Sequence, residues 1–417
     1  MQGFPPPGRH AGKLARAVRW PPALRCLEHR NIRLFFGGQT VSLVGSWMQS
    51  VAQGWLVWRL TRSSELLGAI GFLSQVPVFL FGAWAGSLAD RLPRRGIVLA
   101  TQLNALLQAT LLAALTLGGW VRPWMLLPLA FMLGLSYAFE IPARQALLGE
   151  IAGEDMPNAL ALNSSIVNGA RVAGPALAGL LVAAVGEGWA FALNALSFLG
   201  TIRALLLMRL PSFRPVRRGT GLHLWEGFRW AWQTPLVRAL LALLAAASVF
   251  GMSYVALLPV LAARVLGGGP ELYGLLQASA GVGALVGGVL LLVRGGVRGL
   301  EGRTALGAFA LGAGLLVAAL SRAPALTAAA LAVAGFGYVT QTAGTMTLLQ
   351  ALAPEEMRGR MMGIFSTAFV GLAPFGALAG GFAAARFGVA HTLGVGAAVV
   401  ILSSLAFRLA LRRLRPS

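Results

Sequence analysis

The sequence is short of charged residues, and this shortage decides the class of protein. Charged side chains make up 11% of the 417 residues, whereas 57% of the residues are hydrophobic. Soluble globular proteins carry about a quarter charged residues, which cover the surfaces of their domains. Soluble enzymes, disordered proteins and fibrous proteins are therefore excluded, and a polytopic membrane protein remains.

Cysteine, lysine and histidine are almost missing, which excludes several chemistries. Cys26 is the only cysteine, so the sequence allows no intrachain disulfide and no cysteine-rich metal site. Lys13 is the only lysine, and the lack of a Gly-x-x-x-x-Gly-Lys-Ser/Thr run argues against an ATP-driven pump. The histidines lie in expected tails and loops, at positions 10, 29, 223 and 391. A membrane-embedded transferase would need clustered acids or histidines, so we expect no enzyme activity, no metal and no cofactor.

The net charge of +21 points to a membrane surface, because the arginines flank apolar runs and form no stripe. We therefore expect no nucleic-acid partner. Residues 1–32 are basic and rich in proline, and no apolar stretch of signal-peptide type follows them. We expect this segment to remain as a tail whose arginines lie against anionic membrane lipids.

Continuous apolar runs predict twelve transmembrane helices, and their lack of alternation excludes a membrane barrel. The expected spans are residues 33–58, 66–88, 97–118, 123–142, 157–185, 188–208, 236–263, 271–293, 303–321, 324–349, 358–385 and 388–409. They divide the chain into a basic tail (1–32), a six-helix bundle (33–208), a linker with an interfacial helix (209–235), a second six-helix bundle (236–409) and a basic tail (410–417).

Basic residues predict the orientation of these spans. Most of them lie in the two tails and in the loops that follow even-numbered spans. The loops on the other side hold only Arg59, Arg62, Arg122, Arg264, Arg322 and Arg386. Because basic residues are retained on the cytoplasmic side, we expect both termini to be cytoplasmic and the protein to lie in the inner cell membrane.

The two halves of the chain resemble each other. Residues 147–185 match residues 348–386 without a gap, including an acidic pair and the tetrapeptide Ala-Leu-Ala-Gly at 176–179 and 377–380. A repeat of six-helix units predicts a substrate site between the halves, near the middle of the membrane.

The loop after the second span contains one acid beside three arginines. It reads Gly86-Ser-Leu-Ala-Asp90-Arg91-Leu-Pro-Arg94-Arg95. Asp90 can pair with an arginine or with the positive N-terminus of a neighbouring helix, which would latch this side shut. The alternative is a basic loop that only fixes orientation.

This loop resembles the signature loop of the major facilitator superfamily. The resemblance extends over nearly the whole chain after residue 30 and is strongest with the bacterial branch of enterobactin exporters and macrolide-efflux-like proteins. It is carried by three further stretches: 45–49, 142–146 (Pro-Ala-Arg144-Gln-Ala) and 158–164. It implies two six-helix bundles that rock around a central cavity. It also implies a gate at the cytoplasmic side formed by Gly86, Asp90, Arg91, Arg94, Arg95 and Arg144.

The fifth span contains Gly174, Pro175 and Gly179. Proline removes a backbone donor and glycine thins the helix, so this segment is either a bendable gate helix or a static packing seam. The stretch also resembles the fifth-helix motif of drug/proton antiporters, which implies proton antiport.

The first span has a polar face that predicts a substrate path. Its members recur at helical spacing: Gln39, Ser42, Ser46, Gln49 and Gln53. Spans five and ten add Ser164, Asn168, Tyr338, Gln341 and Thr345. The alternative is a set of hydrogen bonds between helices.

Arg171 is a charge inside the fifth span, and Glu140 is the nearest acid in sequence that enters a span. If the two pair, protonation of Glu140 would release Arg171 and couple protons to transport. The alternatives are a permanent ion pair, or pairing of Glu140 with Arg144 one turn later.

These features together predict a monomeric secondary active exporter of amphipathic small organic molecules, drug-like or siderophore-like, driven by proton antiport. The alternative on the same scaffold is a flippase for lipids or lysophospholipids.

Overall fold

The computed structural model describes residues 22–210, 224–294, 296 and 299–414, and within these ranges the chain is helical and contains no strand. The first half comprises η1 (Pro22–Glu28), α1 (Arg30–Thr61), α2 (Ser64–Arg91), α3 (Arg94–Leu117), η2 (Pro123–Met125), α4 (Leu126–Ala152), η3 (Gly153–Asp155), α5 (Met156–Val185) and α6 (Glu187–Leu207).

The second half begins with the short helix α7 (Leu224–Gln233). It continues with α8 (Pro235–Ala246), η4 (Ala247–Gly251), α9 (Tyr254–Val260), η5 (Leu261–Val265), α10 (Pro270–Arg294), α11 (Leu300–Leu320), α12 (Pro324–Leu352), η6 (Glu355–Met357), α13 (Arg358–Ser366), η7 (Thr367–Gly371), α14 (Ala373–Phe387) and α15 (Val389–Leu414).

The helices form twelve rods in the part of the chain that the structure describes. Ten stretches are long and apolar enough to cross a membrane, and one of them, Pro123–Val185, contains both α4 and α5. The remaining rod is α1, whose hydropathy is lowered by buried glutamines such as Gln49. Two rods are composite, because α8 to η5 form the seventh and α13 to α14 form the eleventh.

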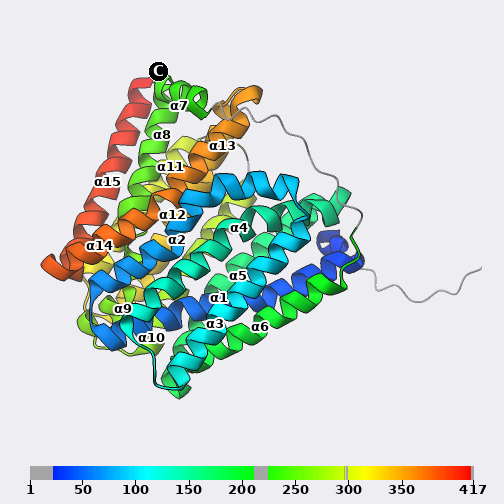
Figure 1. The fold of residues 1–417 in the computed structure, drawn as a ribbon. Helices are drawn as coiled ribbons and strands as arrows, with labels where there is room; N and C mark the ends of the chain where they lie inside the picture. Colours follow the sequence, from blue (N-terminus) through cyan, green and yellow to red (C-terminus); the bar gives the residue numbers. More distant parts are fainter. Residues whose placement is uncertain (1–21, 211–223, 295, 297–298, 415–417) are drawn as a thin grey trace, which may run out of the picture.

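The rods pack as two bundles related by a pseudo-twofold arrangement (Figure 1). In the first bundle α2 packs on α4 and α3 packs on α6; in the second, α10 packs on α12 and α11 packs on α15. Between the bundles, α2 contacts α14 and α5 contacts α10. This arrangement confirms the predicted all-α polytopic fold with two six-helix bundles.

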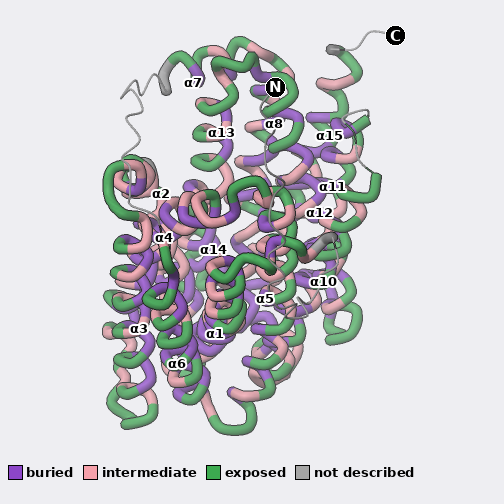
Figure 2. The backbone as a smooth tube through the Cα atoms, turned by 90° about the vertical axis from the view of Figure 1, so that its right-hand side faces the viewer, coloured by how far each residue is buried: buried purple, intermediate pink, exposed green. Residues whose placement is uncertain are grey.

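Large apolar side chains cover the outside of both bundles. Exposed positions lie along the outer faces of the tube in Figure 2. On α3, Leu103, Leu107 and Leu111 are exposed at a spacing of four residues and so form one helical stripe. In water such a stripe would be unfavourable, whereas hydrocarbon is its natural solvent, so these faces lie against lipid.

The internal repeat explains how the bundles meet. The first Ala-Leu-Ala-Gly lies on α5, where a Cβ added to Gly179 would lie 2.9 Å from the carbonyl oxygen of Pro270 on α10. The second lies on α14, where the carbonyl oxygen of Ala377 would lie 2.6 Å from a Cβ on Gly68 of α2. The repeated tetrapeptide therefore supplies the small residues of two equivalent seams, at which helices approach closely.

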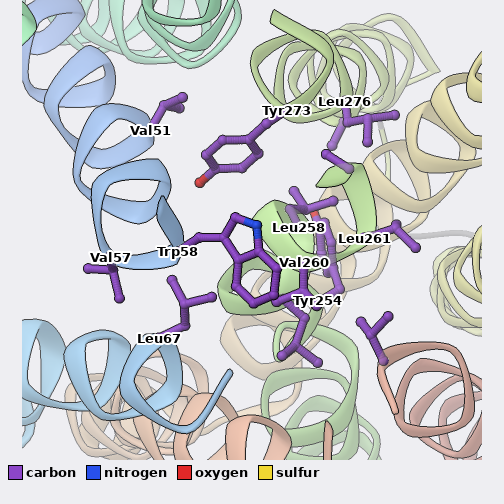
Figure 3. Packing of buried hydrophobic residues seen from close by; sticks show 14 of the residues in the cluster. Val51, Val57, Trp58, Leu67, Tyr254, Leu258, Val260, Leu261, Tyr273 and Leu276 are labelled. Atoms are coloured by element: carbon purple, nitrogen blue, oxygen red, sulfur yellow. The ribbon is translucent and has the colours of Figure 1, made fainter. Parts of the chain in front are cut away.

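The seams occupy one end of the molecule, which we call the seam end; α1 finishes and α2 begins there. We call the other end, at which α1, α3 and α5 begin, the basic end. At the seam end Trp58 of α1 packs between α2 and the second bundle, beside Tyr254, Leu258 and Leu261 (Figure 3). The Tyr273 ring of α10 points back toward α1 and stacks on Trp55 with ring centres 6.4 Å apart.

The bundles are separated at the basic end. A Cβ added to Gly82 or Gly86 on α2, or to Gly359 on α13, would have no neighbour within 4 Å. On α10, Leu292 and Val293 are 84% and 77% exposed. The two bundles therefore form a V that is closed at the seam end (Figure 1).

Two expected segments differ in detail from the structure. Residues 22–32, placed in the basic tail by the sequence, fold as η1 and the start of α1, because Cys26 and Ile32 are buried against the first bundle. Residues 1–21 lie outside the described part. In the expected linker, α7 exposes Phe228 and Trp232, which stack on each other, and Glu226 pairs with Arg360 of α13 at 2.6 Å.

Candidate substrate cavity

A cavity of about 520 Å³ lies between the two bundles. Its lining begins near the basic end, with Phe35 on α1 and Met208 after α6, and runs inward to Ser50 and Ser74. The first bundle contributes all six of its helices, and the second contributes Met252, the start of α9, α10, α12 and η7. Because the seams close the other end, the cavity is reached from the basic end.

The predicted polar face of α1 divides between the cavity and the interior of the first bundle. Gln39, Ser42 and Ser46 line the cavity. Gln49 lies in the bundle interior, where its amide donates to Gln108 and accepts from Asn194, each at 2.8 Å. Gln53, deeper still, is also buried outside the lining. At Gln49 this face therefore forms hydrogen bonds between helices, which is the alternative to a substrate path.

Of the polar residues predicted on α5 and α12, only Tyr338 lines the cavity. Tyr338 lines the cavity, whereas Gln341 and Thr345 are fully buried in the second bundle, with the Gln341 amide 3.4 Å from the Thr345 hydroxyl. On α5, Asn168 donates to the carbonyl oxygen of Ser164 at 2.9 Å, and neither residue belongs to the lining.

Glu140 lines the cavity from α4, and its partner is Arg144. The carboxylate oxygen lies 3.6 Å from the guanidinium nitrogen, one helical turn apart. Glu140 is 8% exposed, so its charge is held in a largely dry position with one cation beside it. Of the pairings left open by the sequence, the structure therefore shows Glu140 with Arg144 at i,i+4, and no ion pair of Glu140 with Arg171 among the described residues.

Arg171 lines the same cavity from α5 without an acidic partner among the described residues. Its guanidinium carbon lies 5.4 Å from the centre of the Trp47 ring, and its Nε is buried without a hydrogen-bond partner. Tyr254 and Tyr338 of the second bundle line the same cavity, and the carbonyl oxygen of Arg171 would lie 2.9 Å from a Cβ on Gly281 of α10. Arg171 therefore lies where the two bundles face each other.

Several lining residues were not predicted from the sequence. Gln75, Gln102 and Gln277 line the cavity, and the amide oxygens of Gln102 and Gln277 have no hydrogen-bond partner in the described structure. Each is a polar residue within an apolar span, a signal that marks functional positions in membranes. Tyr254 and Phe369 are placed by interrupted helices, since Tyr254 follows η4 and Phe369 lies within η7, both π-helical turns. Such turns are frequent at functional sites, but spacing alone does not predict them.

The residues of the predicted gate loop hold the first bundle together or face the separated basic end. Arg94 pairs with Glu150 of α4 at 3.0 Å, and Arg95 donates to the carbonyl oxygens of Leu206 and Met208 at the end of α6. Arg91 is exposed. Asp90, at the end of α2, makes no hydrogen bond or ion pair with any residue that the structure describes. An unpaired Asp90 fits a latch that is open when the basic end is open.

Helix α5, the expected gate helix, is continuous and contacts α1 of its own bundle and α10 of the other. Gly174 packs against Trp47 and Val44 of α1, whereas Pro175 and Gly179 pack against α10, with a Cβ on Gly274 lying 2.5 Å from the Pro175 carbonyl oxygen. These three residues therefore let α5 fit between a helix of its own bundle and a helix of the other. Pro175 and Gly179 belong to the α5–α10 seam in this conformation, and Gly174 lies in the contact of α5 with α1.

Residues 22–416 match the family described as transmembrane secretion effector within the major facilitator superfamily. The enterobactin exporter EntS of Salmonella choleraesuis is 29% identical over 397 residues, which cover 90% of this chain and 91% of that protein. The staphyloferrin A transporter of Staphylococcus aureus is 25% identical over 273 residues, or 62% of this chain and 66% of that protein.

Solved structures show the same fold. A peptide transporter in complex with alafosfalin superposes with a TM-score of 0.71 at 13% identity, covering 93% of this chain and 95% of that one. A bacterial homologue of the iron transporter ferroportin, in an inward-facing state, gives a TM-score of 0.67 at 18% identity, covering 91% and 98%. The family and these relatives are transporters, which agrees with the expectation that the chain is no enzyme. The chain belongs to the transmembrane secretion effector family of the major facilitator superfamily.

Proposed function

We propose that this protein is a secondary active exporter of amphipathic small organic molecules, siderophore-like or drug-like, that works by alternating access. The observation that carries the proposal is the cavity between two bundles that touch at one end and are separated at the other. Rocking of the bundles around such a cavity would expose it to each side of the membrane in turn. The siderophore transporters among its relatives support export of molecules of this size class.

The basic end is the cytoplasmic end in this proposal, and both termini are cytoplasmic. Its support is the concentration of arginine at that end, in the loop of Arg91, Arg94 and Arg95 and in the last turn of α15. The conformation described here would then be inward-facing and ready to load a substrate from the cytoplasm or the inner leaflet of the inner membrane.

The lining suits a molecule with an apolar body and a few polar groups. Aromatic side chains from both bundles include Phe35, Trp47, Phe198 and Phe369. Amides with unpaired atoms lie among them, at Gln39, Gln102 and Gln277. A cavity of this kind binds by apolar contact and orients the ligand through a small number of hydrogen bonds.

Proton antiport is the energy source that we propose, with Glu140 as the proton-carrying residue. Glu140 is the only acid among the lining residues, and it is buried beside Arg144. A carboxylate in this position can exchange its proton when the cavity is open to water. Loss of its charge would free Arg144 and change the balance between the two access states.

Proteoliposomes provide the test. Purified protein is reconstituted and given a pH gradient, and movement of the neutral amphipathic dye N-phenyl-1-naphthylamine and of its sulfonated analogue 8-anilino-1-naphthalenesulfonate is followed by fluorescence. We expect uphill movement of at least one dye that a protonophore abolishes. Uphill movement that is insensitive to the protonophore would remove proton antiport, and no protein-dependent movement of either dye would contradict export of this class of molecule. A fluorescent lysophospholipid added in parallel tests the flippase alternative.

A further inference from the structure

The cavity carries one positive charge that no acidic residue in the described part of the chain balances. Its charged lining residues are Glu140, Arg144 and Arg171. Glu140 and Arg144 offset each other at 3.6 Å, and the cation that acts on the Glu140 carboxylate is Arg144. Arg171 is therefore left with a full charge on the cavity wall, in a segment where an isolated charge costs roughly 3 kcal/mol on insertion scales.

The surroundings of Arg171 supply aromatic faces and hydroxyl groups. Its guanidinium stacks on the Trp47 ring, which limits the orientations that the planar group can adopt. Tyr254 and Tyr338 of the second bundle line the same cavity as Arg171, and each phenol can donate a hydrogen bond. The same wall continues through Phe369, which stacks on Tyr338 with ring centres 6.0 Å apart.

We propose that Arg171 is the anion-recognition residue of the substrate site and that the protein transports organic anions. This inference rests on the proposed function and specifies its substrate class. The substrate would carry a carboxylate, a sulfonate or an acidic phenol, held by the guanidinium through charge-assisted hydrogen bonds. Its aromatic or apolar body would lie along Tyr338 and Phe369. Arg171 therefore serves substrate recognition, whereas Glu140 and Arg144 form a separate ion pair in the same cavity.

The position of Arg171 also relates binding to conformational change. A Cβ on Gly281 of α10 would lie 2.9 Å from the carbonyl oxygen of Arg171, so this residue marks the inner end of the α5–α10 seam. An anion held between Arg171 on the first bundle and the phenols of Tyr254 and Tyr338 on the second would contact both rigid bodies. Its binding energy would then depend on their relative position, which is the condition for a substrate to bias two access states.

Direct binding to the purified transporter tests this inference. The probes are 8-anilino-1-naphthalenesulfonate and N-phenyl-1-naphthylamine, which share one aromatic scaffold and differ in a sulfonate that stays ionised at all working pH values. Binding is measured by equilibrium dialysis against nanodiscs that contain the protein, with empty nanodiscs subtracted. The variants are Arg171→Gln, Arg171→Lys and, as the matched control, Arg203→Gln, at an exposed arginine of α6 outside the cavity lining.

We expect Arg171→Gln to weaken binding of the sulfonate about tenfold or more and to leave binding of the neutral dye within twofold, which also shows that the variant is folded. Arg171→Lys should retain most of the sulfonate affinity, and Arg203→Gln should retain the preference for the sulfonate. The inference is overturned if the wild-type protein does not bind the sulfonate, or if Arg171→Gln weakens both dyes equally or neither. Charge-selective binding without uphill transport would refute export alone, whereas transport without charge-selective binding would refute the anion site alone.

Discussion

The guanidinium of Arg264 lies 4.8 Å from the centre of the Trp58 ring and thereby joins the second bundle to the first. Arg264 also donates to the carbonyl oxygen of Arg62 at 3.3 Å, and the Arg62 guanidinium approaches the same ring at 5.4 Å. Trp58 is fully buried between these groups. Arg62 itself has a φ of 53°, which orients its carbonyl group away from the end of α1. A cation–aromatic clasp therefore closes the seam end.

Arg264→Gln should weaken this clasp and populate conformations that are open at the seam end. Arg264 is exposed, and a cation–π contact at an exposed site contributes about 0.5–1 kcal/mol, which would change the ratio of two access states about two- to fivefold. Spin labels on either side of the seam, read by distance measurement, check the shift. Arg322→Gln, an exposed arginine at the same end, is the control. An unchanged distance distribution in Arg264→Gln would show that the clasp carries little energy.

Gly68→Val should destabilise the conformation described here. Its side chain would meet the Ala377 carbonyl oxygen and the Gly381 Cα, which lie 2.6 Å and 3.0 Å from a Cβ at that position. Overpacking of this kind costs about 1–3 kcal/mol. Gly82→Val on the same helix is the matched control, since a Cβ there meets nothing within 4 Å. Thermal unfolding in detergent distinguishes the two, and equal melting temperatures would count against a tight seam.

Glu140→Gln should remove the coupling of transport to the pH gradient. The amide keeps the shape of the side chain but cannot exchange a proton, so the rate of dye movement should lose its pH dependence while downhill movement persists. Glu154→Gln, an exposed acid in the turn before α5, should keep the wild-type profile. If Glu140→Gln retains the full pH profile, the coupling residue lies elsewhere.

Asp90→Asn should reduce turnover strongly without loss of dye binding. The Asp90 side chain has no partner among the described residues in the conformation that is open at the basic end. We assign it the role of latching that end, which it would perform only in the other state. Removing its charge would leave the present conformation and its cavity intact. Glu65→Gln, at the opposite end of α2, serves as the control. Full turnover in Asp90→Asn would refute a latch.

Cys26 should react slowly with thiol reagents. Burial, together with the nearby carboxylate of Asp155, raises the pKa of its thiol above the ordinary value. A raised thiol pKa means that the folded protein holds the proton more tightly than the unfolded chain does. The associated stability is therefore present below the unfolded pKa and is lost as pH rises through the folded pKa. Iodoacetamide at pH 8 should alkylate Cys26 at least about tenfold more slowly in folded than in dodecyl-sulfate-unfolded protein. Equal rates in both states would contradict burial.

The gate loop shows how far a local pattern predicts a site. The sequence indicates a latch at Asp90 and a cluster of arginines around it. In the structure two of these arginines have partners within their own bundle. Arg94 pairs with an acid of α4, and Arg95 donates to a carbonyl oxygen at the end of α6. The pattern identifies charges at a helix end, but the partners depend on which helices pack beside that end.

Local composition determined the number of spans, the division into two halves and the end that carries the positive charge. These follow from the thickness of the bilayer, from the cost of unpaired backbone groups in hydrocarbon and from basic loops, all of which act on each segment separately. The repeat of Ala-Leu-Ala-Gly is visible in the sequence, but only the packing of the helices places both copies at seams between the bundles.

Tertiary packing alone decided which polar groups face the cavity. Gln39 and Gln49 share one face of α1, yet the first meets the cavity and the second meets Gln108 and Asn194, because different neighbours cover that face at different depths. The same holds for Glu140, which pairs within its own helix and leaves Arg171 to face the second bundle. A helical period fixes the direction of a side chain, whereas its partner is fixed by the helix that packs opposite.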